Sequence, residues 1–343
     1  IVLLLRAVQT TFIACPKVRK SWRRFLWDTA FRSVADVWNI KQFQFVFGTS
    51  LHIYEVWARS HGFPVLVDDI GTHGGRLLWI GPRNTKRVVL YLHGGGYIIP
   101  LQDFSVTFWN YIRLKLEEEG TSAGFAIMSY SIIPTVEFPT QFVQAVEALQ
   151  HIIASGCSPQ NIHIVGDSAG GNLALALLSH MLHPIENVPP ISLASRIGGI
   201  FLMSPWVSLT GDTGSHLVND SFDIVGTKTF AYCGRKVLED VPDSLRMYLE
   251  ISKAPDTWFK GIDKLVSRIL ITAGGVECLR DDIVQVSHEL SKNHSEVRLI
   301  VQENGVHNDP FYDFLAGERH LGDLTPKILV WLCQGLKGSK EED

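Results

Sequence analysis

The sequence has few cysteines, and they form no recognisable pattern. Its 343 residues hold five, with no C-x-x-C pair and no spacing typical of a metal site. We therefore expect reduced, partly buried thiols rather than a disulfide framework or a metal centre. The five are Cys15, Cys157, Cys233, Cys278 and Cys333.

A surplus of charge of one sign is also lacking. The formal net charge is −4, so the basic surplus of many nucleic-acid-binding proteins is absent and we expect no nucleic-acid partner. Internal repeats are absent, and the only low-complexity stretch is the charged tail GSKEED. With 46% hydrophobic residues, the composition is that of a globular protein with a large core.

No apolar run is long enough to span a bilayer. The start, IVLLLRAVQTTFIA, is apolar but short and interrupted, and the basic, aromatic stretch KVRKSWRRFLW (17–27) follows. We favour two amphipathic helices that pack on the body of the protein. The alternatives are association of the N-terminus with an anionic membrane surface, or an anchor upstream of residue 1. For localisation, an intracellular site is expected, with the endoplasmic-reticulum membrane as one option.

Strand-like and helix-like segments alternate from residue 63 onward, which predicts an α/β fold with a mostly parallel, doubly wound sheet. The first two strands are expected to form a hairpin. The predicted strands are 63–70, 75–81, 87–92, 124–130, 161–166, 197–204, 267–275 and 296–302. The predicted helices are 104–120, 138–156, 172–182, 281–293 and 324–336.

Residues 207–262 interrupt this alternation. They contain no clear strand, are rich in aromatic residues, and are too long for a connecting loop. We predict a small helical insertion at 207–262 and a helical N-terminal segment at 1–60. The core would then comprise 61–206 and 263–343.

Ser168 has the sequence context of a catalytic nucleophile. The run GDSAG (166–170) fits G-x-S-x-G and lies between a predicted strand and a predicted helix. Such a sharp turn holds the serine hydroxyl out at the carboxyl end of the sheet. The alternative is a tight turn with no chemistry, since any strand-to-helix turn needs small residues.

A glycine run after the strand 87–92 offers hydrogen-bond donors for a substrate oxygen. In HGGGY (93–97), the N–H groups of Gly94, Gly95 and Gly96, together with that of Ala169, could form an oxyanion hole. A phosphate-binding loop is the alternative, but the lysine of a P-loop is missing. His93 is interpreted as an anchor of this loop rather than as a second base.

The general base and its acid are expected after late strands. His307 follows the strand 296–302 and a short turn, which places it at a carboxyl strand end. For the acid, Glu277 comes first after the strand 267–275. Asp281 is the alternative, because it and Asp282 also suit the first turn of a helix. The order serine, acid, histidine is that of an α/β-hydrolase.

The sequence resembles the hormone-sensitive-lipase group of α/β-hydrolase esterases. The resemblance rests on HGGGY (93–97), GDSAGGNLA (166–174), AGGVECLRDD (273–282) and GVH (305–307), with a weaker match at 130–149. The family usually has aspartate where Glu277 stands. The resemblance implies that segments 1–60 and 207–262 together form a cap over the site. Fungal steryl acetyl hydrolases are the subgroup suggested.

These observations predict a serine carboxylic-ester hydrolase with a Ser168–Glu277–His307 triad. Neither a metal nor another cofactor is needed. The expected substrate is a short-acyl, acetyl-like ester of a hydrophobic alcohol, and the oligomeric state is open. Acyl transfer, another non-hydrolytic reaction, or ligand binding on the same fold are alternatives. The residues expected to line the substrate pocket, each of which also suits an ordinary core position, are Tyr97, Trp206, Phe222 and Phe311.

Overall fold

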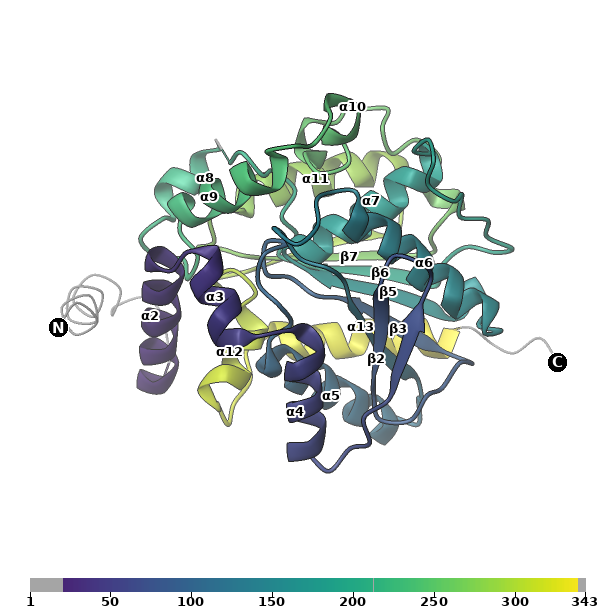
Figure 1. Ribbon diagram of the computed structural model, residues 1–343, viewed down its shortest axis with the longest axis horizontal. Helices are drawn as coiled ribbons and strands as arrows, with labels where there is room; N and C mark the ends of the chain where they lie inside the picture. The colour runs from purple at the N-terminus through teal and green to yellow at the C-terminus, as the bar shows by residue number, and fades with distance from the viewer. Residues whose placement is uncertain (1–20, 212, 339–343) are drawn as a thin grey trace.

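The centre of the molecule is an eight-stranded sheet with helices on both faces (Figure 1). It is seen in a computed structural model that describes residues 21–211 and 213–338. The strand order is β1-β2-β4-β3-β5-β6-β7-β8, and the neighbours from β4 to β8 are parallel. The strands are β1 Val67–Ile70, β2 Gly75–Ile80, β3 Val88–Leu92, β4 Gly124–Ser129, β5 Ile162–Asp167, β6 Gly199–Met203, β7 Ile269–Gly274 and β8 Val297–Gln302. The predicted α/β class is confirmed, including the antiparallel hairpin of β1 and β2.

The apolar runs of the sequence become strands buried on both faces. Every residue of β3, β5, β6 and β7 is buried, as expected of parallel strands covered by helices. One face packs against α6 (Thr140–Ala154), α7 (Ala169–Leu182) and α11 (Arg280–Asn293). The other packs against α5 (Asp103–Glu118), α12 (Asp309–Ala316) and α13 (Leu324–Gly338).

The long insertion between β6 and β7 is helical. It contains α8 (Gly214–Val218), α9 (Thr227–Leu238) and α10 (Asp243–Arg246), and none of its described residues lies in a strand. The N-terminal helices α2 (Trp22–Val37), α3 (Ile40–Phe47) and α4 (Ser50–Ser60) precede the sheet. In Figure 1, α2 and α3 lie on the same side of the molecule as α8 and α9. The Thr229 hydroxyl of α9 donates to the carbonyl of Ala35 at 3.2 Å, so α2 and α9 are in contact.

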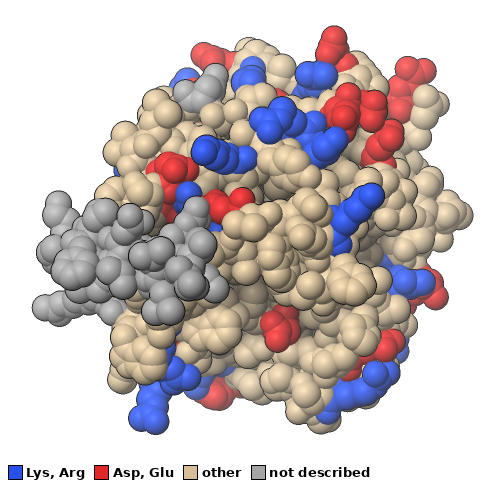
Figure 2. Space-filling view, turned by 60° about the vertical axis from the view of Figure 1, so that its left-hand side comes forward, with Lys and Arg blue, Asp and Glu red and all other residues tan. Residues whose placement is uncertain are grey.

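Residues 1–20 lie outside the described part of the chain, so most of the predicted N-terminal amphipathic segment does too. Its last residues begin α2, where Trp22, Leu26 and Trp27 are exposed. On the face shown in Figure 2, blue and red side chains are scattered over the upper part and along the lower rim, and the surface between them is mostly tan. Within 21–211 and 213–338, no helix combines the length and the hydropathy needed to cross a membrane.

Candidate active site

Ser168 occupies the sharp turn between β5 and α7. Its backbone angles are φ 50° and ψ −118°, a strained conformation for a residue with a side chain. The flanking glycines are required by packing. A Cβ on Gly166 would lie 2.4 Å from the carbonyl oxygen of Gly170, and one on Gly170 would lie 1.9 Å from that of Leu92. The turn therefore forms only with glycine at these two positions.

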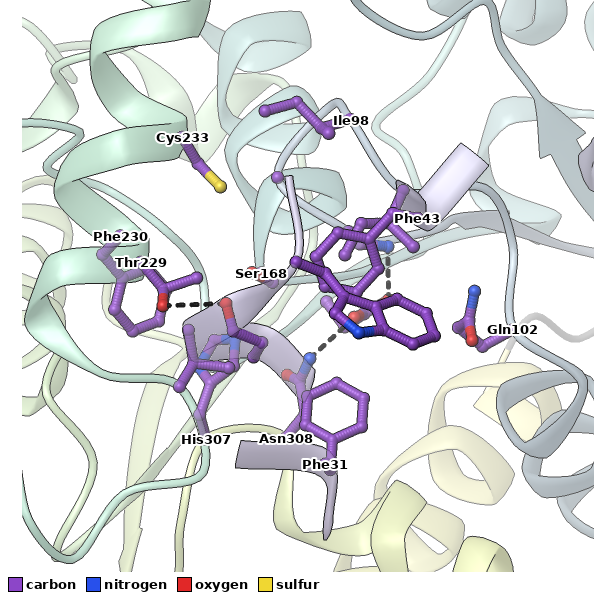
Figure 3. Close-up of a pocket in the computed structure, with 18 of the residues that line it drawn as sticks. Phe31, Phe43, Ile98, Gln102, Ser168, Thr229, Phe230, Cys233, His307 and Asn308 are labelled. Carbon is purple, nitrogen blue, oxygen red and sulfur yellow. Dashed lines mark hydrogen bonds between the residues drawn. The ribbon is translucent and has the colours of Figure 1, made fainter. Parts of the chain in front are cut away.

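Ser168 and His307 line the same cavity, which has a volume of about 410 Å³. In Figure 3, Ser168 lies near the middle, with His307 and Asn308 to one side of it. Residues 94–96 of the glycine loop line the cavity as well. Three segments that the sequence analysis selected separately thus meet at one place, at the carboxyl ends of β3, β5 and β8.

The N–H groups of the glycine loop have two different roles: one holds the loop in place, and the others are candidates for binding a substrate oxygen. The N–H of Gly94 donates to Asp167 Oδ1 at 2.8 Å, so it is already engaged and does not act as the expected oxyanion donor. Gly95 and Gly96 have φ 100° and 60°, left-handed conformations that glycine adopts readily and that allow the backbone to approach a ligand closely. Together with Ala169, the first residue of α7, they are the remaining candidate donors.

His93 is built into the wall behind this loop. Its ring stacks on Tyr130 with centroids 4.2 Å apart, and its Nδ1 lies 2.8 Å from the carbonyl oxygen of Gly94. The Tyr130 hydroxyl donates to the carbonyl of His93 itself. Burial lowers the pKa of His93 to about 4, so the ring is neutral at pH 7. These contacts support the interpretation of His93 as an anchor of the loop.

Asp167, the residue before the serine, joins the parts of the site. Besides Gly94 it accepts hydrogen bonds from the Tyr91 hydroxyl at 2.6 Å and from Asn308 Nδ2 at 2.8 Å. Burial raises its pKa to about 6, and the three donors oppose that rise. The carboxylate therefore ties the glycine loop to the residue that follows His307. Asp167 was not among the residues predicted from the sequence, although it lies inside the GDSAG motif.

Glu277 is fully buried at the end of β7. Its Oε2 accepts hydrogen bonds from the Ser204 hydroxyl at 2.6 Å and from the N–H of Gly274 at 2.9 Å. The Ser204 hydroxyl in turn accepts from the N–H of Asn308 at 3.1 Å, which brings the Glu277 side chain to the histidine loop. Burial first, and the neighbouring Asp223 second, raise the pKa of Glu277.

Asp281, the alternative acid, is engaged elsewhere. Its carboxylate accepts from the N–H of Ser215 at 2.9 Å and pairs with Arg280, and its side chain is 40% exposed in the first turn of α11. Asp281 thus serves the helix terminus and the contact with α8.

His307 is almost completely buried, which lowers the pKa of its ring to about 3. The Phe230 ring of α9 meets the imidazole edge-on at 5.2 Å between centroids. Within the described residues, Nδ1 of His307 and Oε1 of Glu277 both lack a hydrogen-bond partner. Nδ1 of His307 can donate a hydrogen bond and Oε1 of Glu277 can accept one. The loops that carry these two atoms are linked through the Ser204 hydroxyl.

Two of the four aromatic residues expected in the pocket line the cavity, namely Trp206 and Phe311. Tyr97 is buried behind the glycine loop, where its hydroxyl donates to Asn172 Oδ1 at 2.8 Å. Phe222 is 45% exposed on the surface of the insertion. Neither Tyr97 nor Phe222 lines the cavity. A residue that is close in sequence to a cavity-lining residue can point its side chain in another direction.

Most of the apolar wall comes from residues that the sequence analysis did not select. Helix α3 and the end of α2 contribute one side, and α9 contributes the opposite side (Figure 3). The first set is Phe31, Trp38, Ile40, Phe43 and Phe47, and the second is Phe230, Tyr232 and Cys233. Sequence periodicity predicts that such apolar residues share a buried face of a helix, but it does not distinguish residues that line a cavity from residues that pack in the core.

The fold and site define an α/β-hydrolase, and the chain belongs to this family: the family model described as alpha/beta hydrolase fold matches residues 89–310. An esterase of the bacterial hormone-sensitive-lipase family has a similar structure, with a TM-score of 0.68 and 20% identity. The superposition covers 94% of this chain and 99% of that esterase. The predicted α/β-hydrolase fold is confirmed, and the chain is similar in structure to this hormone-sensitive-lipase-family esterase.

Curated relatives are similar in sequence over part of their length. Steryl acetyl hydrolase 1 of Saccharomyces cerevisiae is 24% identical over 249 residues, which are 67% of this chain and 55% of that protein. Neutral cholesterol ester hydrolase 1 of Bos taurus is 29% identical over 199 residues, 51% of this chain and 47% of that protein. The chain spans between 45% and 66% of the length of three curated relatives that it matches.

Proposed function

We propose that the protein is a serine carboxylic-ester hydrolase. The observation that carries the proposal is that Ser168, at a strained strand-to-helix turn, and His307 line one cavity together with the glycine loop. Family membership and the names of the relatives support the same reaction class.

In the proposed mechanism, His307 removes the proton from the Ser168 hydroxyl as the serine oxygen attacks the ester carbonyl. The N–H groups of Gly95, Gly96 and Ala169 stabilise the negative charge that develops on the carbonyl oxygen. His307 then donates the proton to the leaving alcohol and activates the water that releases the acid. Glu277 orients the imidazole and stabilises its cationic form, and its unpartnered Oε1 is the proposed acceptor for the proton on Nδ1.

The proposed substrate is an acetyl-like ester of a hydrophobic alcohol such as a sterol. Two kinds of observation support this choice: the cavity wall is mainly aromatic and aliphatic, and two of the relatives are named for steryl acetate and cholesterol ester hydrolysis. A volume of about 410 Å³ is within the usual range for small-molecule sites.

The first test is hydrolysis of p-nitrophenyl esters from acetyl to dodecanoyl by the protein and its Ser168→Ala variant. We expect hydrolysis by the wild type with a short-chain optimum, and a loss in kcat of roughly 10⁴–10⁶-fold in the variant. A folded wild type that hydrolyses none of these esters would contradict the proposal.

Acyl transfer is the second candidate. Ser168 and His307 are only 5% and 3% exposed, and a site shielded from water favours an alcohol over water as acyl acceptor. Adding a hydrophobic alcohol and measuring the new ester against the free acid distinguishes the two reactions.

A further inference from the structure

The segment between α8 and α9 contacts both loops that carry the proposed acid and base. Asp223 in this segment is buried, and both of its carboxylate oxygens accept hydrogen bonds. Oδ1 accepts from the N–H of His307 at 2.9 Å and from that of Ile224 at 2.8 Å. Oδ2 accepts from the N–H of Cys278, the residue after Glu277, at 2.7 Å. One carboxylate thus joins two loops that follow different strands.

Asn219 of this segment and Ser215 of α8 hold the acid loop from the same side. Asn219 Nδ2 donates to the carbonyl of Glu277 at 2.9 Å, and the Ser215 hydroxyl donates to the carbonyl of Cys278 at 2.6 Å. The backbone at Glu277 is therefore fixed by the insertion, whereas its carboxylate is fixed by the core through Ser204 and Gly274.

Arg32 of α2 holds the segment from outside. Its Nη1 donates to the carbonyls of Asp220 and Asp223 at 2.7 and 2.8 Å, and its Nε donates to Asp36 at 3.0 Å. The packing is close, because a Cβ on Gly226 would lie 2.2 Å from Arg32 Nη2. An N-terminal helix is thereby connected, through Arg32 and Asp223, to the backbone of His307.

We propose that Asp223 is a positioning residue for ester hydrolysis, which sets the acid and histidine loops against each other, and that Arg32 holds Asp223 in place. The inference rests on the proposed function. It assigns the insertion a part in building the catalytic geometry, besides covering the cavity.

Charge and burial explain why this contact matters. Hydrogen bonds from backbone N–H groups to a carboxylate are stronger than those between neutral groups. Without the carboxylate, the buried N–H groups of Cys278 and His307 have no acceptor, and the loops must move to satisfy them. A displacement of about 1 Å at reacting groups costs roughly 100-fold in rate.

The test compares Asp223→Asn with Asp243→Asn. Asparagine keeps the shape of Asp223 but has one accepting oxygen, and its NH₂ group would face an N–H donor. Asp243 lies in α10 of the same insertion, and its side chain is 97% exposed. Activity is measured with p-nitrophenyl acetate per active serine, counted by titration with a fluorophosphonate, so that unfolded protein is excluded.

We expect Asp223→Asn to lower kcat roughly 10- to 100-fold with KM changed less than about threefold, and Asp243→Asn to match the wild type. A purely structural role would reduce the number of active serines and leave kcat per serine unchanged. A kcat per serine within about twofold of wild type would overturn the proposal.

Arg32→Ala provides a second variant, with Arg59→Ala of α4 as its control, because the Arg59 side chain is 65% exposed and pairs only with Glu55 among the described residues. We expect a loss in kcat of roughly 3- to 10-fold for Arg32→Ala and none for Arg59→Ala. If Asp223→Asn does not fold, the comparison of Arg32→Ala with Arg59→Ala tests the proposal instead, and an unchanged kcat in Arg32→Ala overturns it.

Failure of the hydrolase proposal is recognised separately, as a wild type that hydrolyses no ester.

Discussion

At the scale of single residues, the site depends on which carboxylate is directed toward His307. Glu277 and Asp281 are four residues apart, and both follow β7. The buried Glu277 accepts a hydrogen bond from the Ser204 hydroxyl, which also accepts one from the N–H of Asn308 in the histidine loop. Asp281 lies beside α8, where it contacts Ser215. Environment, rather than residue type, separates the two roles.

Neutralising each acid in turn tests this assignment. Glu277→Gln keeps the size of the side chain but removes the charge that would stabilise the imidazolium, so we expect kcat to fall roughly 10²- to 10⁴-fold. Asp281→Asn should leave kcat within about threefold, because its carboxylate serves a helix terminus worth about 1 kcal/mol or less. Steady-state kinetics on p-nitrophenyl acetate measure both variants. The opposite ranking would make Asp281 the acid.

At the scale of elements, the position of the nucleophile is set by how closely α7 approaches β3. The helix begins at Ala169, directly after the serine, and Gly170 lies against the carbonyl of Leu92. No side chain fits between them, so the close approach brings the N-terminal amides of α7 next to the glycine loop. The G-x-S-x-G pattern thus reflects helix-to-strand packing as much as the turn itself.

Gly170→Ala should therefore destabilise the protein more than an ordinary helical substitution. Its Cβ would overlap a backbone oxygen that cannot move independently, and we expect a loss of roughly 3 kcal/mol or more in the free energy of unfolding. Gly214→Ala in α8 is the matched control, because its Cβ would meet only Asp281 Oδ2, at 3.4 Å. Urea unfolding followed by circular dichroism compares the two. Equal effects would contradict the packing argument.

The sequence predicted these elements well where the pattern is local. The apolar runs identified the strands, and GDSAG and HGGGY identified the turn and the loop. Helix α7 begins three residues before its predicted start, because Ala169, Gly170 and Gly171 carry no apolar periodicity. Helix α12, directly after His307, was not predicted.

Contacts between distant segments are what the sequence could not predict. Asp223 bonds to backbone groups 55 and 84 residues away, and no local pattern distinguishes it from the other acids of the insertion. The aromatic wall from α3 depends in the same way on how the N-terminal helices fold back over the sheet.

At the scale of the whole molecule, acid sensitivity is expected from histidines buried in the neutral form. His163 on β5 is fully buried beside Trp331, and within the described residues neither ring nitrogen has a partner. Burial, and then the charge of Arg268, lower its pKa to about 3. It lies outside the catalytic cavity, so its effect on stability can be measured apart from activity.

Replacing His163 with leucine should stabilise the protein increasingly as the pH falls. Below its ordinary pKa of about 6.5, the imidazole binds a proton in the unfolded chain but not in the folded one, so stability is lost as the pH falls. At pH 5 this costs the wild type about 2 kcal/mol that His163→Leu does not lose. Urea unfolding at pH 7 and pH 5 measures the difference, with the exposed His52→Leu as control. An advantage that does not grow between the two pH values would refute the argument.

The cavity wall has a further consequence for how this protein can diversify. Its two sides come from α3 and α9, which belong to segments far apart in the chain and outside the sheet. Phe230 of α9 also packs on the imidazole of His307, whereas no ring contact joins His307 to the described aromatic residues of α3. Mutations in α3 can therefore reshape one side of the cavity while the other side and the chemistry are inherited unchanged. Such modularity lets one lineage sample many esters by small, separable steps.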